Sequence, residues 1–360
     1  MTLSNCCYNH FIFSRGAEFM KIAILQVADT GPLESLVVML RTAGYDCAIP
    51  DNDLKNVLRK IGCNLVYDIQ GLVDGMGYDP PFPIPEAGVA DMERRDVLYV
   101  DVKAHRDYET IVRRWPHLAG KVLWYRINGG KMEHVIKPDG EDCGDEVNPP
   151  CPVLTPNQWY QGHDRSYTCW PPFVRFNDYQ DRIDGTTTGY LPPVCLIHNF
   201  AGWGYGAMEG PARAMGIRIY GRGSPDGLVK HATVPMLLRH SRCMVHFKSS
   251  DAPGYAIYEA MAAGCPVVCT RRLIWRCRMR DLLIPGETCL VFDRETHDGL
   301  SEADVRHCTE ELKEHIQALK DQACNRRIGQ AGRERLAEIM WRPDRDLPSL
   351  HEFMTRNFSV

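Results

Sequence analysis

Apolar runs alternate with helical patterns along the chain from residue 20 onwards. The run at 21–27 is almost continuously apolar, which is typical of a parallel strand covered on both faces. A helical pattern follows over 32–43, and Gly44 supplies the residue that commonly closes a helix. Further strands are predicted at 45–49, 64–69, 97–102, 122–126 and 153–155.

A second series of the same kind begins near Pro193. Its predicted strands are 194–199, 217–221, 243–247, 266–270 and 289–292. Helical patterns separate these strands, and two longer ones, 302–320 and 326–340, close the series. Two successive series of strands and helices predict an α/β fold with two Rossmann-like domains and parallel sheets.

Breaks in the pattern indicate the domain organisation. The stretch 166–193 contains four prolines and little periodicity, and we interpret it as the linker between domains. We therefore expect a first domain over 20–177 and a second over 178–340. Residues 341–360 are expected to pack back on the first domain, and residues 1–19 to form an N-terminal extension outside the core.

Composition narrows the class of protein. The 360 residues carry a formal net charge of −4, so no global positive field attracts nucleic acid or a membrane surface. No apolar run approaches the roughly 20 residues of a membrane-spanning helix. The fifteen cysteines include no Cys-x-x-Cys pair and lie mostly in apolar runs, which favours free thiols and a cytoplasmic protein. No histidine pair has the spacing of a zinc site, and no metal is predicted.

The most informative segment is 249–270, SSDAPGYAIYEAMAAGCPVVCT. It predicts a turn after a strand, a helix that starts near Gly254 and stops at Gly264, and a following strand. The first amides of such a helix, at Gly254, Tyr255 and Ala256, suit a diphosphate. Asp251 and Glu259, eight positions apart, place one carboxylate before the helix and one within it, where they can hold hydroxylated groups on either side of a phosphate.

This segment resembles the donor site of retaining GT-B glycosyltransferases, particularly the family-4 group. The match is Asp251, seven residues, then the run EAMAAGCPVV from Glu259 to Val268, and the likeness extends over most of 193–341. The resemblance implies two Rossmann-like domains that face a cleft. It also implies that Glu259 holds the nucleotide ribose, that Asp251 faces the donor sugar, and that no cofactor is tightly bound. Asp251 stands where the family usually has Glu, so the donor sugar stays open.

The sequence lacks the basic residues that usually neutralise the donor diphosphate. Family members usually carry a basic pair after the first strand of the second domain, whereas the loop 199–206 has no Lys or Arg. A desolvated diphosphate needs compensation, and the candidates are Arg222, in the turn after the second strand, and Lys248. An inactive nucleotide-sugar binding protein is the alternative.

Candidate residues in the first domain are fewer. His105 follows the strand 97–102, and the resemblance implies that it contacts a sugar at the cleft, although an ordinary surface histidine fits equally well. The run Asp51-Asn52-Asp53 matches a metal-binding pattern, but its place before a helical pattern favours a helix cap. The irregular stretch 71–88 has the length of a binding loop or lid.

One region has a strong local charge. Residues 213–280 contain twelve basic and three acidic side chains, a net +9 in a chain that totals −4. Basic side chains around an aromatic suit phosphate backbones and stacked bases, and here they also fit an amphipathic helix whose arginines pair with acidic neighbours. The cluster comprises Arg271, Arg272, Trp275, Arg276, Arg278 and Arg280.

Together these features predict a metal-independent glycosyltransferase that moves a sugar from a nucleotide-diphosphate sugar to a hydroxyl with retention. Asp251 and His105 are the predicted catalytic residues. The acceptor and the oligomeric state stay open; DNA with a hydroxymethylated pyrimidine is the leading specific acceptor, since some phage enzymes of this fold act on such bases. A sugar-nucleotide epimerase of the same shape is the further alternative.

Overall fold

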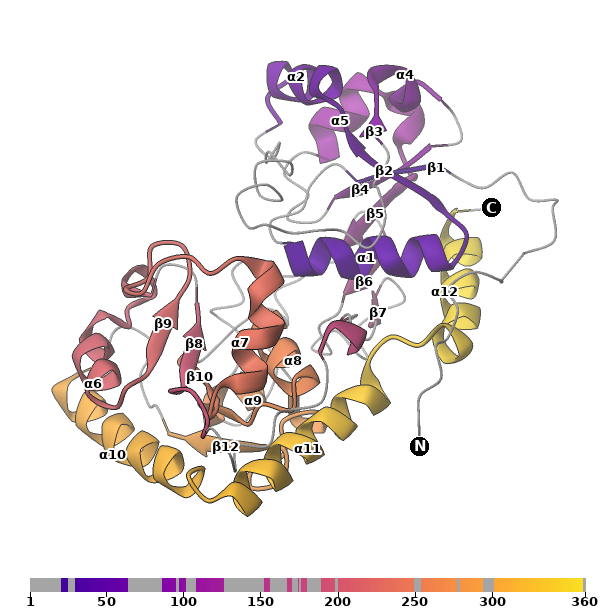
Figure 1. Cartoon of the computed structure of the whole chain (residues 1–360). Coiled ribbons are helices and arrows are strands. Elements are labelled where there is room, and N and C mark those ends of the chain that lie inside the picture. The colour runs from indigo at the N-terminus through magenta and orange to yellow at the C-terminus, as the bar shows by residue number, and fades with distance from the viewer. Residues whose placement is uncertain are drawn as a thin grey trace.

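The computed structural model contains two parallel sheets, one in each half of the chain, with helices around both (Figure 1). It describes residues 21–24, 30–63, 86–94, 97–101, 108–125, 152–155, 167–169, 174, 176–179, 189–197, 200–248, 254–276, 279–293 and 301–358. The predicted strand 64–69 lies outside these ranges, as do residues 1–19 and most of 71–88.

Within the described ranges, seven strands form the first sheet, in the order β3-β2-β1-β4-β5-β6-β7, and every neighbouring pair is parallel. This order places β1 and β4 at the centre, where the chain reverses its direction across the sheet. The strands are β1 (Lys21–Ile24), β2 (Asp46–Pro50), β3 (Glu86–Ala87), β4 (Val97–Asp101), β5 (Val122–Tyr125), β6 (Val153–Thr155) and β7 (Tyr167–Cys169).

Two edge strands correct the sequence prediction. Strand β7 lies in the stretch 166–193, for which the sequence predicts a linker, yet Val153 of β6 pairs with Tyr167. Strand β3 lies within the irregular stretch 71–88 and pairs with the end of β2. Both strands have only two or three residues, too few for a detectable alternation, and the prolines beside them favour loops. Only the partner strands identify them.

In the part of the chain that the structure describes, the second sheet has five parallel strands in the order β12-β11-β10-β8-β9. All residues of β10 and β11 are buried, so helices cover both faces of the sheet. The chain turns from one side of the sheet to the other between β8 and β10. The strands are β8 (Val194–Leu196), β9 (Arg218–Tyr220), β10 (Met244–His246), β11 (Val267–Thr270) and β12 (Cys289–Phe292).

Helices follow the strands in both halves. Those of the first half are α1 (Thr30–Thr42), α2 (Asn52–Lys60), α4 (Val89–Met92) and α5 (Tyr108–Arg114). Those of the second half are α6 (Glu209–Ala214), α7 (Val234–His240), α8 (Tyr255–Ala262), α9 (Arg271–Arg276), α10 (Glu302–Ala318), α11 (Gln322–Ile339) and α12 (Pro343–Phe358). Helix α11 begins four residues before its predicted start because the Asp321 side chain caps it, accepting from the Cys324 amide at 2.7 Å.

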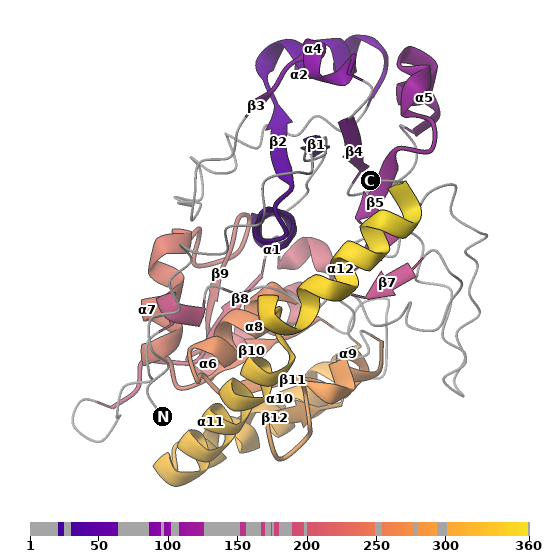
Figure 2. The same cartoon turned by 90° about the vertical axis from the view of Figure 1, so that its right-hand side faces the viewer.

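The last helix leaves the second half and returns to the first. Figure 2 shows α12 rising from the end of α11 toward the first sheet. Its buried side chains, among them Phe353 and Met354, share one core with Ile22 of β1 and Leu36 of α1. The C-terminal segment therefore completes the core of the first half.

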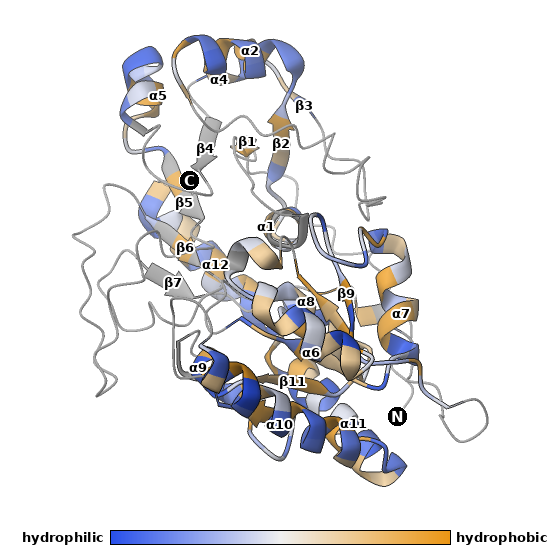
Figure 3. Cartoon of the chain, turned by 90° about the vertical axis from the view of Figure 1, so that its left-hand side faces the viewer, coloured by the Kyte–Doolittle hydropathy of each residue, from blue (hydrophilic) through white to orange (hydrophobic). Residues whose placement is uncertain are grey.

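Hydropathy follows the layers of the fold. In Figure 3 the strands β2 and β11 are predominantly hydrophobic, whereas α2 and α10 carry many hydrophilic residues. Within the ranges that the structure describes, no helix combines the length and the apolar character needed to span a membrane.

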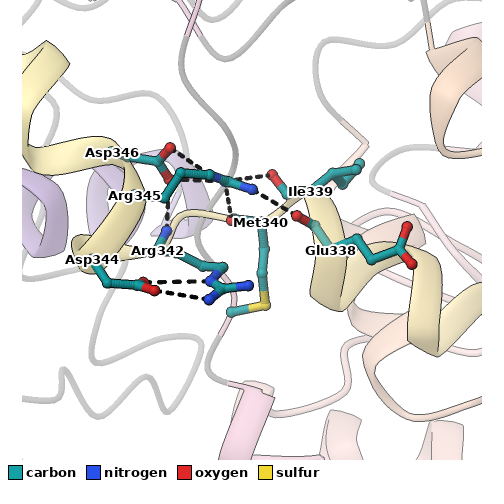
Figure 4. Close-up of polar contacts among 7 residues, drawn as sticks. All are labelled: Glu338, Ile339, Met340, Arg342, Asp344, Arg345 and Asp346. Carbon is teal, nitrogen blue, oxygen red and sulfur yellow. Dashed lines mark hydrogen bonds and ion pairs between the residues drawn. The ribbon is translucent and has the colours of Figure 1, made fainter.

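A small polar cluster fixes the junction between α11 and α12 (Figure 4). The Arg345 guanidinium donates to the carbonyls of Glu338 and Met340 at 2.7 and 2.8 Å, and so caps the end of α11. The same group pairs with Asp346 at 2.6 Å, and this carboxylate raises the pKa of Arg345. Arg342 pairs in the same way with Asp344 at 2.8 Å and lowers the pKa of that carboxyl.

Candidate functional site

The carboxyl ends of the second sheet define the candidate site. In open parallel sheets, ligands bind outside these ends, at the point where the strand order reverses. Here that point lies between β8 and β10, and α8 follows β10 in the chain. The elements next to it are the loop after β8, the turn after β9 and the first turn of α8.

The turn after β9 is a rigid glycine turn fixed to the loop that follows β8. Gly221 and Gly223 have φ values of 149° and 72°, which favour glycine. The Ser224 hydroxyl donates to the carbonyl of Ile197 at 2.6 Å and accepts from the Phe200 amide at 3.3 Å. This serine therefore holds together the two loops that flank the carboxyl ends of β8 and β9.

Arg222 projects from this turn. Its side chain is exposed, and it has no ion pair or hydrogen bond to any described residue. The nearby Asp226 is already engaged, because it accepts from the Ile219 amide at 2.6 Å and pairs with Arg218 at 3.4 Å. Arg222 is thus a cation available to an anionic ligand.

Lys248 lies directly after β10. The buried Thr270 hydroxyl, at the end of β11, donates to the Lys248 carbonyl at 3.0 Å and fixes this part of the backbone. Burial raises the pKa of the Cys195 thiol in β8, and the positive charge of Lys248 opposes that shift. The ammonium group therefore acts electrostatically on β8 from the end of β10.

Helix α8 presents its N-terminus to the same edge. Gly254, buried, precedes the helix, and its carbonyl accepts from the Ile257 amide at 2.7 Å. The first amides of a helix have no acceptor within the helix itself. In α8 these are the amides of Tyr255 and Ala256. Farther along the helix, the side chains of Ile257 and Met261 are buried in the core.

Glu259 is held by a residue that sequence reasoning missed. His231 Nε2 lies 2.8 Å from Glu259 Oε1, and the two side chains are 25% and 16% exposed. His231 belongs to the short 3-10 turn His231–Thr233 that leads into α7. The two residues are 28 positions apart and belong to no common motif, so only the packing of α7 against α8 reveals the pair.

Part of the predicted site lies on elements at one edge of the second sheet. Glu259, Gly254, Tyr255, Ala256, Arg222 and Lys248 lie on elements around the carboxyl ends of β8, β9 and β10. The predicted catalytic residues Asp251 and His105 lie outside the described residues, so their roles remain predictions. Among the described parts of the chain, no three His, Cys, Asp or Glu residues form a cluster that could hold a metal ion.

The other sequence candidates have structural partners where they are described. Asp51 caps α2, accepting from the Leu54 amide at 2.7 Å, which agrees with the cap interpretation. Arg271, exposed at the start of α9, pairs with Asp293 at 2.7 Å. Arg280 is exposed and Arg272 is half-buried. Arg278 and the side chains of Trp275 and Arg276 lie outside the described part of the chain.

Comparison with known proteins gives the class. A family described as "Glycosyl transferase-like" matches residues 207–342, which include the glycine turn, His231 and α8. No curated protein matches the chain.

Solved structures share the fold of almost the whole chain. Sucrose-phosphate synthase from Thermosynechococcus elongatus matches with a TM-score of 0.58 and 13% identity, covering 94% of this chain and 99% of that one. The pneumococcal O-GlcNAc transferase GtfA, in complex with UDP and GlcNAc, gives 0.56 and 7%, covering 96% and 100%. Anabaena Alr3699/HepE, in complex with UDP and glucose, gives 0.55 and 10%, covering 94% and 99%.

The predicted α/β fold with two Rossmann-like domains and parallel sheets is confirmed, and it is the GT-B fold of glycosyltransferases. Residues 207–342 form a glycosyl transferase-like domain within it. The chain thus combines the GT-B fold with a segment that matches a glycosyl transferase-like family.

Proposed function

We propose that this protein is a glycosyltransferase that moves a sugar from a nucleotide-diphosphate sugar to a hydroxyl acceptor with retention of anomeric configuration. The observation that carries the proposal is the Glu259 carboxylate, held at 2.8 Å by His231 beside the point where the second sheet reverses. A carboxylate is a strong acceptor for the paired hydroxyls of a ribose. Two structures of the same fold, of HepE and GtfA, contain UDP and a sugar.

The donor fits the second half of the chain, 178–340. With the ribose on Glu259, the diphosphate lies at the amides of Gly254, Tyr255 and Ala256, at the positive end of α8. Arg222 and Lys248, which flank this edge from β9 and β10, supply the positive charge that the loop 199–206 lacks. These groups stabilise the charge that develops on the departing diphosphate, and the proposed reaction needs no metal.

The bond changes take place at the anomeric carbon. The acceptor oxygen bonds to that carbon from the face that the diphosphate leaves, and the acceptor proton passes to the departing phosphate oxygen. In this proposal Asp251 faces the donor sugar and His105, from the first domain over 20–177, contacts a sugar. No side-chain nucleophile is required, and retention follows because attack and departure share one face.

Replacing Glu259 tests the proposal. Glu259→Gln removes the charge that strengthens hydrogen bonds to ribose, so we expect KM for the donor to rise roughly 10- to 100-fold. Purified protein is incubated with a panel of nucleotide sugars, and the anomer of the product is read by NMR. Glu310→Gln, on an exposed position of α10, is the matched control and should leave KM unchanged.

Four other outcomes contradict the proposal in distinct ways. Epimerisation of the donor without acceptor indicates an epimerase, and binding without turnover indicates an inactive binding protein. Loss of activity with a chelator, restored by manganese, indicates metal-dependent transfer. If Glu259→Gln keeps full affinity for the donor, Glu259 does not bind the donor.

DNA bearing a hydroxymethylated pyrimidine is the acceptor that we propose as the second, more specific function. The arginine segment 271–280 begins at the end of β11, which is parallel to β10, so it starts at the same edge of the sheet as the donor site. The surrounding 213–280 carries a net +9 from twelve basic and three acidic residues. The Arg271–Asp293 pair shows that one of these arginines is partly neutralised.

Salt dependence separates this acceptor from a small hydroxylated one. Binding to hydroxymethylcytosine duplex should weaken steeply with salt, because phosphate contacts release counterions. Replacing Arg271, Arg272, Arg276, Arg278 and Arg280 with Gln should flatten that slope. Negligible binding at low salt excludes DNA and leaves the arginines as a solvated surface.

A further inference from the structure

The contact between His231 and Glu259 has a defined direction. An ionised carboxylate only accepts hydrogen bonds, so His231 Nε2 must carry the proton that it shares with Glu259 Oε1 over 2.8 Å. This holds for neutral and for charged imidazole alike. One oxygen of the carboxylate is therefore directed at the histidine, and the plane of the carboxylate is set by it.

The histidine can impose this orientation because its own backbone is fixed. His231 begins the 3-10 turn that leads into α7, and the α7 side chains Val234 and Leu238 are buried in one core with Ile257 and Met261 of α8. The two helices pack directly against each other. The distance between the two side chains is thus set by a packed core, and the second carboxylate oxygen, Oε2, keeps a fixed direction.

We infer that His231 is a positioning residue that makes the nucleotide site selective for ribose over deoxyribose. The inference rests on the proposed function, in which Glu259 holds the ribose. A carboxylate fixed by His231 can accept from both ribose hydroxyls, and a 2′-deoxy nucleotide leaves one of these acceptor positions unused. Without the histidine the carboxylate rotates about its side-chain bonds, adapts to a single hydroxyl, and discriminates less.

Paired nucleotides measure this selectivity directly. Calorimetry gives Kd of the wild-type protein for UDP, ADP and GDP and for their 2′-deoxy forms, and the base that binds most tightly is kept. The 2′-deoxy form lacks one hydrogen bond to the charged Glu259 carboxylate. We therefore expect the wild type to bind the ribose form roughly tenfold more tightly or better. His231→Leu keeps apolar volume but lacks the donor, and we expect the preference to fall to about twofold.

Conservative and matched variants separate positioning from folding. His231→Gln retains an N–H donor and should restore most of the ribose preference. His240→Ala, at the other end of α7, is the control and should leave the preference unchanged. In the double variant with Glu259→Gln, the His231→Leu change should have no further effect, because the histidine acts through the carboxylate. If the Leu variant does not fold, Ala at position 231 takes its place in the comparison with Gln.

The outcomes distinguish this inference from the proposed function. If the wild type prefers ribose and His231→Leu keeps that preference, or weakens both nucleotide forms equally, the positioning role is overturned while the donor site stands. If the wild type binds nucleoside diphosphates without preferring ribose, the inference is likewise overturned. If it binds none of them, the proposed function fails, and the inference fails with it.

Discussion

Two glycines allow a close approach between α11 and the end of α8. Gly264, with φ of 64°, ends α8 in the left-handed region, where a side chain is strained. Gly329 of α11 lies against it, and a Cβ at this position would be 2.0 Å from the Gly264 carbonyl oxygen. Because that neighbour is backbone, it cannot rotate away. The close packing of α11 against the helix that carries Glu259 therefore requires glycine at 329.

A methyl group at Gly329 should separate the two helices. We expect Gly329→Ala to lower the free energy of unfolding by about 2–4 kcal/mol, since the clash forces backbone to move. Urea denaturation measures this change. Gly210→Ala is the control, because a Cβ at that helical position of α6 meets nothing within 4 Å, and the better helix propensity of Ala should raise stability slightly. If the two variants change the free energy of unfolding equally, a Cβ at position 329 does not clash with the Gly264 carbonyl oxygen, and the prediction is wrong.

At the scale of elements, the junction of α11 and α12 determines the direction in which the last helix leaves. Arg345 satisfies carbonyls at the end of α11, which otherwise lack partners, and it is itself held by Asp346. The backbone amide of Arg342 donates to the same Asp346 carboxylate at 2.7 Å. The first turn of α12 is thereby tied to the last turn of α11 (Figure 4).

Removing the guanidinium should loosen this tie. The Arg345 side chain is 41% exposed, so solvent screens its ion pair and we expect Arg345→Met to cost only about 1 kcal/mol of unfolding free energy. Thermal and urea denaturation give the value. Arg356→Ala, an exposed position on the same helix, should change it by less than about 0.5 kcal/mol. A loss in the Met variant no larger than in this control would contradict a capping role.

At the scale of the whole molecule, α12 belongs to the core of the first half, although it follows the second half in the chain. Trp341, Leu350, Phe353, Met354 and Phe358 are buried with residues of β1, α1 and β2. The end of the chain, which follows the second half in sequence, therefore supplies part of the core of the first half. Tyr45 of the first half also contacts His351 of α12, with ring centroids 6.0 Å apart. This connection makes the C-terminal helix part of the first domain in structure, although it follows the second in sequence.

The sequence by itself determined the fold class and the helix that carries Glu259. The apolar runs that predict parallel strands, and the segment 249–270, are local signals. They can be recognised in the sequence because strand burial and helix termination depend on residues that are neighbours along the chain. Strands 153–155 and 289–292 were predicted with the bounds that the structure shows.

Only the tertiary structure decided which distant residues meet. The edge strands β3 and β7 are too short to have a pattern and exist through pairing with β2 and β6. His231 reaches Glu259 because α7 packs against α8, and Gly329 is required because α11 crosses the end of α8. Such contacts depend on how helices pack across a sheet, and no local pattern in the sequence records that geometry.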